Sequence, residues 1–210
     1  MPRTRVVPVA GLLCLALLAA SVGPPAAAQT AAAQATVPPG VHPADARFMS
    51  GMILHHAQAV LMAGWAPTHG ADPRVRTLCA RIVVSQRDEI ALMASWLRRR
   101  GLPVPDTAMA LPPDMAGMAE HALMPGMLTA AQLAALDRAR GAAWDRLLLA
   151  AMIRHHEGAI TMVNELFGSP GAPADPLVFQ FASDVSSGQL AEIARMRELL
   201  AALPADSSGS

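Results

Sequence analysis

An eleven-residue pattern occurs twice in this chain and constrains its fold more than any other feature. Residues 52–62 read MILHHAQAVLM, and residues 152–162, shifted by 100 positions, read MIRHHEGAITM. Asp45 and Asp145 match at the same shift. An Asp-Pro pair and a Gln-x-x-Glu-Ile-x-x-Met pattern recur at a shift of 103, at residues 72–73 and 175–176 and at residues 86–93 and 189–196. Self-similarity of this kind indicates a chain built from two related halves.

The spacing of apolar residues within each half is helical. Phe48, Met52, His55, Ala59 and Met62 follow one another by three or four positions, which places them on one face of an α-helix. The second copy repeats this spacing 100 positions later. The pattern predicts a helix in each half whose core-facing side carries histidine and methionine.

Capping residues predict where the helices begin. Asp72 and Asp175 suit the N-cap position, and each precedes a proline that fits the first helical turn. Thr129 with Gln132 is typical of a capping box. We therefore predict helices near 43–66, 72–99, 129–167 and 173–202, with Gly141 as a weak point in the third. The predicted fold is all-α, a four-helix bundle of two repeated hairpins, 43–99 and 129–202, joined by a long Met-rich linker at 100–128.

The N-terminus has the pattern of a secretory signal peptide. Arg3 and Arg5 precede an apolar run from Val6 to Ala20, and a run of alanines that ends at Ala28 offers a cleavage site. We predict a signal peptide at 1–28, a disordered leader at 29–41, one bundle domain at 42–203 and a disordered tail at 204–210. The expected location is periplasmic or secreted, without membrane insertion after the signal is cleaved.

The predicted mature chain is nearly neutral. Loss of Arg3 and Arg5 leaves 14 of the 16 basic residues against 16 acidic residues, a formal charge of −2. This balance gives no reason to expect nucleic acid or an anionic membrane as a partner. Cys79 is the one cysteine left after cleavage, so no intramolecular disulfide can form, and we expect its thiol to be buried.

Four histidines in two matched pairs are the strongest candidates for chemistry. A lone histidine on a buried helix face is usually a hydrogen-bonded core residue, but burying several imidazoles without partners is costly. Met52 lies three residues before His55 and four before His56, so it neighbours both on the helix. We therefore predict metal ligands among the paired His and Met residues of both halves: Met52, His55, His56, Met62, Met152, His155, His156 and Met162.

Carboxylates and further thioethers occupy core-facing positions around these pairs. Glu89 and Glu192 lie on the predicted partner helices. Each carboxylate either accepts a hydrogen bond from an imidazole and orients it, or binds the metal itself. The accessory candidates are these two acids together with Met49, Met93 and Met196.

The linker carries a second Met-rich group: Met115, Met118, His121, Met124 and Met127, which are spaced by three. Thioethers are soft ligands that suit Cu(I) better than Mg, Ca or Zn. The alternative is a Met-rich flap that packs over the end of the bundle, and this alternative applies above all to Met124 and Met127.

Other metal chemistries match the motifs less well. A zinc protease needs His-Glu-x-x-His, but Ile160 stands where the second histidine would follow His156. A ferritin-type di-iron site needs Glu-x-x-His, and positions 52 and 152 are both Met. Two alternatives to copper binding remain. One is a ferritin-like metalloenzyme or metal-oxidising protein that uses His and Glu, and the other is an exported helical interaction module without metal.

The double Met-Ile-x-His-His pattern, the Gln-x-x-Glu-Ile-x-x-Met pattern and the Met-Pro-Gly-Met-Leu-Thr run at 124–129 resemble the exported family called domain of unknown function 305 (DUF305). The resemblance spans roughly His42 to Leu203. It implies a ferritin-like four-helix bundle and, through the family's CopM-type periplasmic members, copper binding by the Met and His residues named above. Cu(I) is the favoured ion, with Ag(I) or Cu(II) as alternatives. It also implies sequestration or trafficking of the ion rather than catalysis, with a periplasmic copper donor or acceptor as the expected protein partner.

Overall fold

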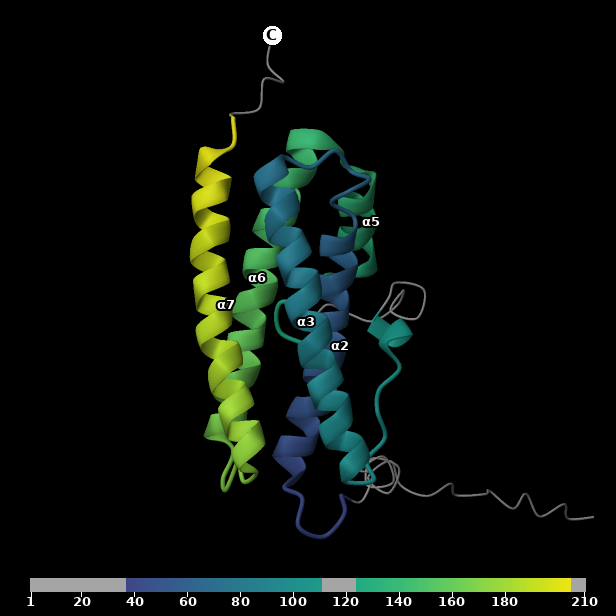
Figure 1. Ribbon diagram of the computed structural model, residues 1–210, viewed down its shortest axis with the longest axis vertical. Helices are drawn as coiled ribbons and strands as arrows, with labels where there is room; N and C mark the ends of the chain where they lie inside the picture. The colour runs from purple at the N-terminus through teal and green to yellow at the C-terminus, as the bar shows by residue number, and fades with distance from the viewer. Residues whose placement is uncertain (1–36, 111–123, 205–210) are drawn as a thin grey trace, which may run out of the picture. The chain divides into compact units, whose positions relative to one another are not determined.

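The computed structural model describes residues 37–110 and 124–204 (Figure 1). Their elements are α2 (Pro43–Gly64), α3 (Pro73–Arg99), the short 3-10 helix η1 (Thr107–Ala110), α5 (Ala130–Arg138), α6 (Gly141–Gly168) and α7 (Pro176–Ala202). These two ranges contain no strand, which confirms the all-α prediction. None of their helices is long and apolar enough to cross a membrane. The predicted signal peptide, most of the leader and tail, and Met115, Met118 and His121 lie outside the described residues.

The predicted capping residues begin the helices. The Asp72 side chain accepts a hydrogen bond from the backbone N–H of Arg74 at the start of α3. Asp175 accepts in the same way from Leu177 at the start of α7, and Thr129 and Gln132 form the predicted capping box of α5. These side chains satisfy backbone donors that have no partner within the helix.

The largest difference from the predicted helices is a break in the third one. The helix predicted at 129–167 is two helices, α5 and α6, separated at Ala139–Arg140. Gly141 has a φ of +57°, a left-handed conformation that glycine adopts without steric cost. Its N–H donates to the carbonyl oxygen of His69 over 2.8 Å, so the break is fixed by a contact with the loop between α2 and α3.

The long helices form two hairpins whose first helices meet in the centre. α2 packs mainly on α3, α6 packs mainly on α7, and α2 also packs on α6 (Figure 1). The buried Asp45 carboxylate, near the start of α2, accepts from the N–H groups of Ala174 and Asp175, which follow the end of α6. Asp145, near the start of α6, accepts from the N–H of Asp72, which follows the end of α2. α2 and α6 therefore run antiparallel, and each repeated aspartate caps the turn of the other hairpin.

The antiparallel crossing divides the buried methionines into two groups that mix the halves. One apolar cluster contains Met52 of α2, Met93 of α3 and Met162 of α6, together with Met49. The other contains Met62 of α2, Met152 of α6 and Met196 of α7. Met52 therefore shares its cluster with Met162 of the other half. Met62, nearly three helical turns further along α2, belongs to the second cluster.

The last residues before α5 lie across the two central helices. The buried side-chain amide of Gln58 donates to the carbonyl oxygen of Leu128 over 3.0 Å and accepts from the Leu128 N–H over 2.7 Å. On α6, a Cβ added at Gly158 would lie 2.0 Å from the carbonyl oxygen of Pro125. Glycine at 158 is therefore what lets the segment 124–128 approach α6 this closely.

Cys79 is buried in α3, as predicted. Burial, with a smaller contribution from the Asp145 carboxylate, raises the pKa of its thiol to about 12. The reactive form of cysteine is the thiolate, so this thiol is inert at neutral pH.

Candidate metal centre

The two histidine pairs meet where α2 crosses α6. The ring centroids of His55 and His155 are 3.8 Å apart. His56 lies 6.5 Å from His55, and His156 lies 6.3 Å from His155, measured between ring centroids. All four side chains are buried, with exposed fractions of 1% or less. The two halves thus contribute to one central cluster of imidazoles.

A glutamate of the neighbouring helix holds the outer imidazole of each pair. His56 Nε2–H donates to Glu89 Oε2 over 2.6 Å, and His156 Nε2–H donates to Glu192 Oε2 over 2.7 Å. Both carboxylates are partly exposed, at 31% and 26% of the side chain. Of the two roles that sequence left open for these acids, this geometry corresponds to orientation of an imidazole, because the hydrogen bond leaves Nδ1 available to a ligand.

The two central imidazoles differ in their partners. His55 Nε2–H donates to the carbonyl oxygen of Pro125 over 2.9 Å. His155 is the equivalent residue of the second half, and its Nε2 has no hydrogen-bond partner. The segment 124–128 therefore breaks the symmetry of the cluster on this side.

Four ring nitrogens of the cluster are buried without a protein partner: Nδ1 of His55, His56 and His156, and Nε2 of His155. A buried polar atom without a partner is costly, and such atoms call for a specific explanation. All four belong to the rings of the one central cluster, so their lone pairs or N–H groups are available to a bound ligand. His69, the buried histidine of the α2–α3 loop, has no such unpaired atom, because both of its ring nitrogens have hydrogen-bond partners.

Burial keeps the central pair neutral. It lowers the pKa of His55 from 6.5 to about 3, with a further contribution from the nearby His56 ring and an opposing one from the Pro125 carbonyl. The pKa of His155 is also well below its ordinary value, first because of burial and then because of His55. Neutral imidazole is the form that binds metal ions, so these two rings need lose no proton to do so near neutral pH.

The remaining candidates differ in how far they are buried. Met49, Met52, Met62, Met93, Met152 and Met196 are fully buried, and Met162 is nearly so. Met124 and Met127 are half-buried at the end of the linker, and the Met127 N–H donates to the Met124 carbonyl oxygen. Within 37–110 and 124–204, no three His, Cys, Asp or Glu side chains are grouped so as to hold a metal ion on their own. A metal site built on these histidines therefore needs other donor atoms as well. The buried methionines of α2 and α6, on the same helices as the histidines, could supply thioether sulfurs.

Sequence reasoning missed three contributors to the centre: the Pro125 carbonyl, the Gln58 amide and Gly158. Gln58 and Gly158 occupy equivalent positions in the two copies of the repeat. This difference between the two repeats was the available signal. It indicates that one segment of the chain contacts the two central helices in different ways.

A family model described as domain of unknown function (DUF305) matches residues 45–200. The chain belongs to the DUF305 family. A crystal structure of a DUF305 fragment from Deinococcus radiodurans is 30% identical, covers 79% of this chain and 100% of its own, and superposes with a TM-score of 0.66. CopM in its Cu(II)-bound form is 28% identical over 75% of this chain and 96% of its own, with a TM-score of 0.59. CopM in its Cu(I)-bound form is 26% identical over the same shares, with a TM-score of 0.56.

A viral protein is similar to part of this chain. An uncharacterized protein of Acanthamoeba polyphaga mimivirus is 40% identical over 58 residues. The match covers 28% of this chain and 38% of the viral protein, so the chain spans well under half of that relative. The solved structures match three quarters of this chain or more, so they show the fold of the family over a much larger part of the chain than the viral match covers.

The buried central imidazoles make the stability of this DUF305 protein depend on pH. Between pH 6.5 and about 3 the unfolded chain protonates His55 but the folded chain does not. The folded state should therefore lose stability as pH falls through this window, by about 1.4 kcal/mol per pH unit for each such imidazole. Urea unfolding at neutral and at two acidic pH values measures the slope. The double variant His55→Leu, His155→Leu should show a shallower slope, and an unchanged slope would assign the acid sensitivity to other groups.

Proposed function

We propose that this protein is an exported copper-binding protein that sequesters or passes on Cu(I) through imidazole and thioether donors in its helical core. The observation that carries the proposal is the cluster of four buried imidazoles with unpartnered ring nitrogens. Its ligands would come from His55, His56, His155 and His156, with thioethers from the repeated methionines Met52, Met62, Met152 and Met162.

The donor set favours copper over other metals. Cu(I) and Ag(I) accept imidazole and thioether together, whereas Zn and Fe sites in proteins are built from His, Cys and carboxylates. The lack of a three-residue His, Cys, Asp or Glu group in the described ranges disfavours the second kind of site. CopM, a structural neighbour, has been solved with Cu(I), Cu(II) and Ag, which makes copper the first ion to test.

The competing function, a His/Glu metalloenzyme, requires Glu89 and Glu192 as ligands. Each of these carboxylates accepts a hydrogen bond from a histidine Nε2, and this role favours positioning over direct ligation. We therefore assign the protein a binding role without turnover. Met93 and Met196, one helical turn beyond these acids and fully buried, would complete the thioether lining of the cluster.

The N-terminal signal-peptide pattern supports both the proposed location and the proposed kind of partner. The signal-peptide pattern at 1–28 supports export to the periplasm or beyond, where copper would arrive from, and leave to, another protein. The partly exposed Glu89 and Glu192 are the parts of the centre nearest to solvent along α3 and α7.

Anaerobic titration of the mature protein with Cu(I) against a competing chelator tests the proposal, with Zn(II) and Fe(II) titrated in parallel. We expect tight Cu(I) binding and at least about 100-fold weaker binding of Zn(II) and Fe(II), because thioethers are poor ligands for both. Tight Zn(II) or Fe(II) binding without Cu(I) binding would support the metalloenzyme instead. No binding of any of the three would support the interaction module.

A further inference from the structure

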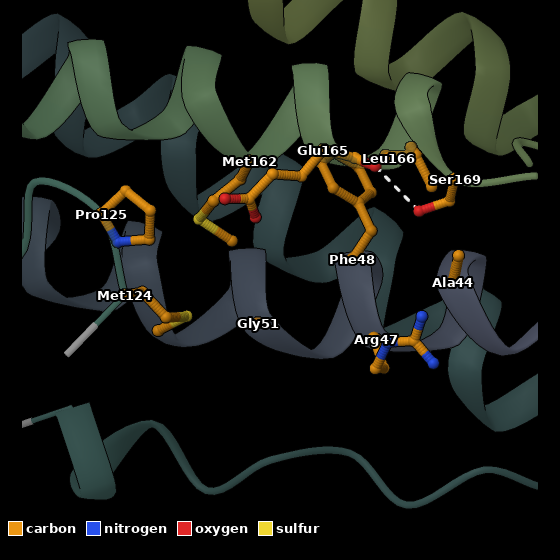
Figure 2. A pocket seen from close by; sticks show the side chains of 10 residues that line it. All are labelled: Ala44, Arg47, Phe48, Gly51, Met124, Pro125, Met162, Glu165, Leu166 and Ser169. Atoms are coloured by element: carbon orange, nitrogen blue, oxygen red, sulfur yellow. Dashed lines mark hydrogen bonds between the residues drawn. The ribbon is translucent and has the colours of Figure 1, made fainter. Parts of the chain in front are cut away.

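A solvent-facing pocket of about 330 Å³ lies between α2 and α6 beside the end of the linker (Figure 2). Two methionines line it, Met124 from the linker and Met162 from α6, together with Phe48 and Gly51 of α2. The charged side chains of Arg47 and Glu165 also line it, one of each sign.

The Met124 sulfur and the Met162 methyl group both approach Gly51. A Cβ added at Gly51 would lie 3.3 Å from the Met124 sulfur and 3.3 Å from the Met162 methyl carbon. Figure 2 shows the two side chains reaching towards Gly51 from opposite segments. The equivalent residue of the second half is Ala151, which is buried and carries the Cβ that position 51 lacks. Position 51 thus leaves room where Met124 and Met162 approach one another.

These two methionines differ in their access to solvent from the other methionines of the apolar cluster that they contact. Met49, Met52 and Met93 of the same apolar cluster are all 0% exposed. Met124 is half-buried and Met162 is 8% exposed, and both face the open pocket. If methionine acted here only as core filler, its sulfur would be expected to be packed on all sides. An ion arriving from solvent would meet this pair before any of the buried thioethers.

We propose that Met124 and Met162 form an outer binding site for a soft monovalent metal ion, Cu(I) or Ag(I). Met162, named above among the thioethers of the centre, would then pass the ion on to the histidine cluster. The inference rests on the proposed function, since the cluster is its destination. Two thioethers suit a soft ion that accepts low coordination numbers, and they carry no proton that the ion must displace. Glu165 adds a negative charge at the pocket, which Arg47 offsets, so the charges of the lining do not exclude a cation.

The chain connects this outer site directly to the inner one. Pro125, the residue after Met124, accepts the hydrogen bond of His55 Nε2–H over 2.9 Å. Met162 lies two helical turns beyond His155 on the same face of α6. Both halves of the outer pair therefore belong to segments that also contact the central imidazoles.

Silver titration followed by NMR of ¹³C-methyl-labelled methionine tests the outer site, because Ag(I) is a soft ion that air does not oxidise. The key sample carries His55, His56, His155 and His156 all changed to Ala, which removes the inner imidazoles. In this variant we expect the Met124 and Met162 methyl signals to move on addition of one equivalent of Ag(I). Unchanged Met124 and Met162 signals at saturating Ag(I) would overturn the inference.

Three single variants in the wild-type background keep the test decisive if the four-histidine variant folds poorly. Met124→Leu and Gly51→Ala should each weaken the Ag(I)-dependent shift of the Met162 methyl signal, Gly51→Ala by roughly 10-fold in affinity because the added methyl group occupies the space between the thioethers. Gly188→Ala, the same change at a position where an added Cβ would meet nothing within 4 Å, should leave that shift unaltered. Equal shifts in all three variants would also overturn the inference.

The two proposals fail in distinguishable ways. Copper bound by the histidines with no response of Met124 or Met162 would remove the outer site and leave the proposed function intact. A response of both methionines, together with Cu(I) affinity equal in the wild type and the four-histidine variant, would retain the outer site and overturn the assignment of the inner one.

Discussion

Cu(I) affinity is expected to fall at least about 100-fold when His55, His56, His155 and His156 are all changed to Ala. Loss of a residue that only orients a metal ligand typically costs 10- to 100-fold in affinity, so loss of the ligands themselves should cost more. Competition titration with a Cu(I) chelator under anaerobic conditions measures the difference. The thioethers that remain should leave a weak residual affinity, since they are Cu(I) ligands in their own right.

His69→Ala is the matched control for this experiment. His69 is also buried, at 4% exposed, but its Nδ1 contacts Thr68 and Trp65, and its Nε2 contacts Asp137. Its replacement should reduce stability, because it ties the α2–α3 loop to α5, and leave Cu(I) affinity unchanged. Equal losses of affinity in both proteins would mean that the effect comes from damage to the fold. Equal retention would move the site to the methionines.

The repeat and the capping residues predicted most of the fold because both act locally. Asp72 and Asp175 accept from N–H groups two residues away, and the Thr129–Gln132 box is closed within four residues. The break before α6 depends instead on the carbonyl of His69, far away in sequence. The weak helix propensity of Gly141 indicated where a break could occur. The continuous apolar periodicity nevertheless predicted one helix through this position.

The candidate centre was predictable as a set of residues and not as an arrangement. Helical spacing assigns His55 and Met52 to the core-facing side of α2, but it does not say which helix faces them. The antiparallel crossing of α2 and α6 decides that His55 stacks near His155 and that Met52 shares a cluster with Met162. The crossing in turn depends on Asp45 and Asp145, whose hydrogen bonds join residues too far apart in sequence for local patterns to reveal.

Gly158→Ala is expected to destabilise the protein by about 1–3 kcal/mol, the usual cost of forcing a methyl group into a filled site. The new Cβ would lie 2.0 Å from the Pro125 carbonyl oxygen and 2.7 Å from the Gly126 nitrogen. These are backbone atoms, which a side-chain rotation cannot move aside. The segment 124–128 must therefore shift away from α6, and the hydrogen bond from His55 Nε2–H to Pro125 should be lost with it.

Gly188→Ala gives the matched control, because Gly188 is also inside a long helix but a Cβ there would meet nothing within 4 Å. Alanine is the better helix former, so this change should raise stability by roughly 0.5–1 kcal/mol. Urea unfolding of both variants measures the two effects, which are opposite in sign. If Gly158→Ala were also stabilising, then the linker would not rest on α6, and the Pro125 carbonyl could not be the group that distinguishes His55 from His155.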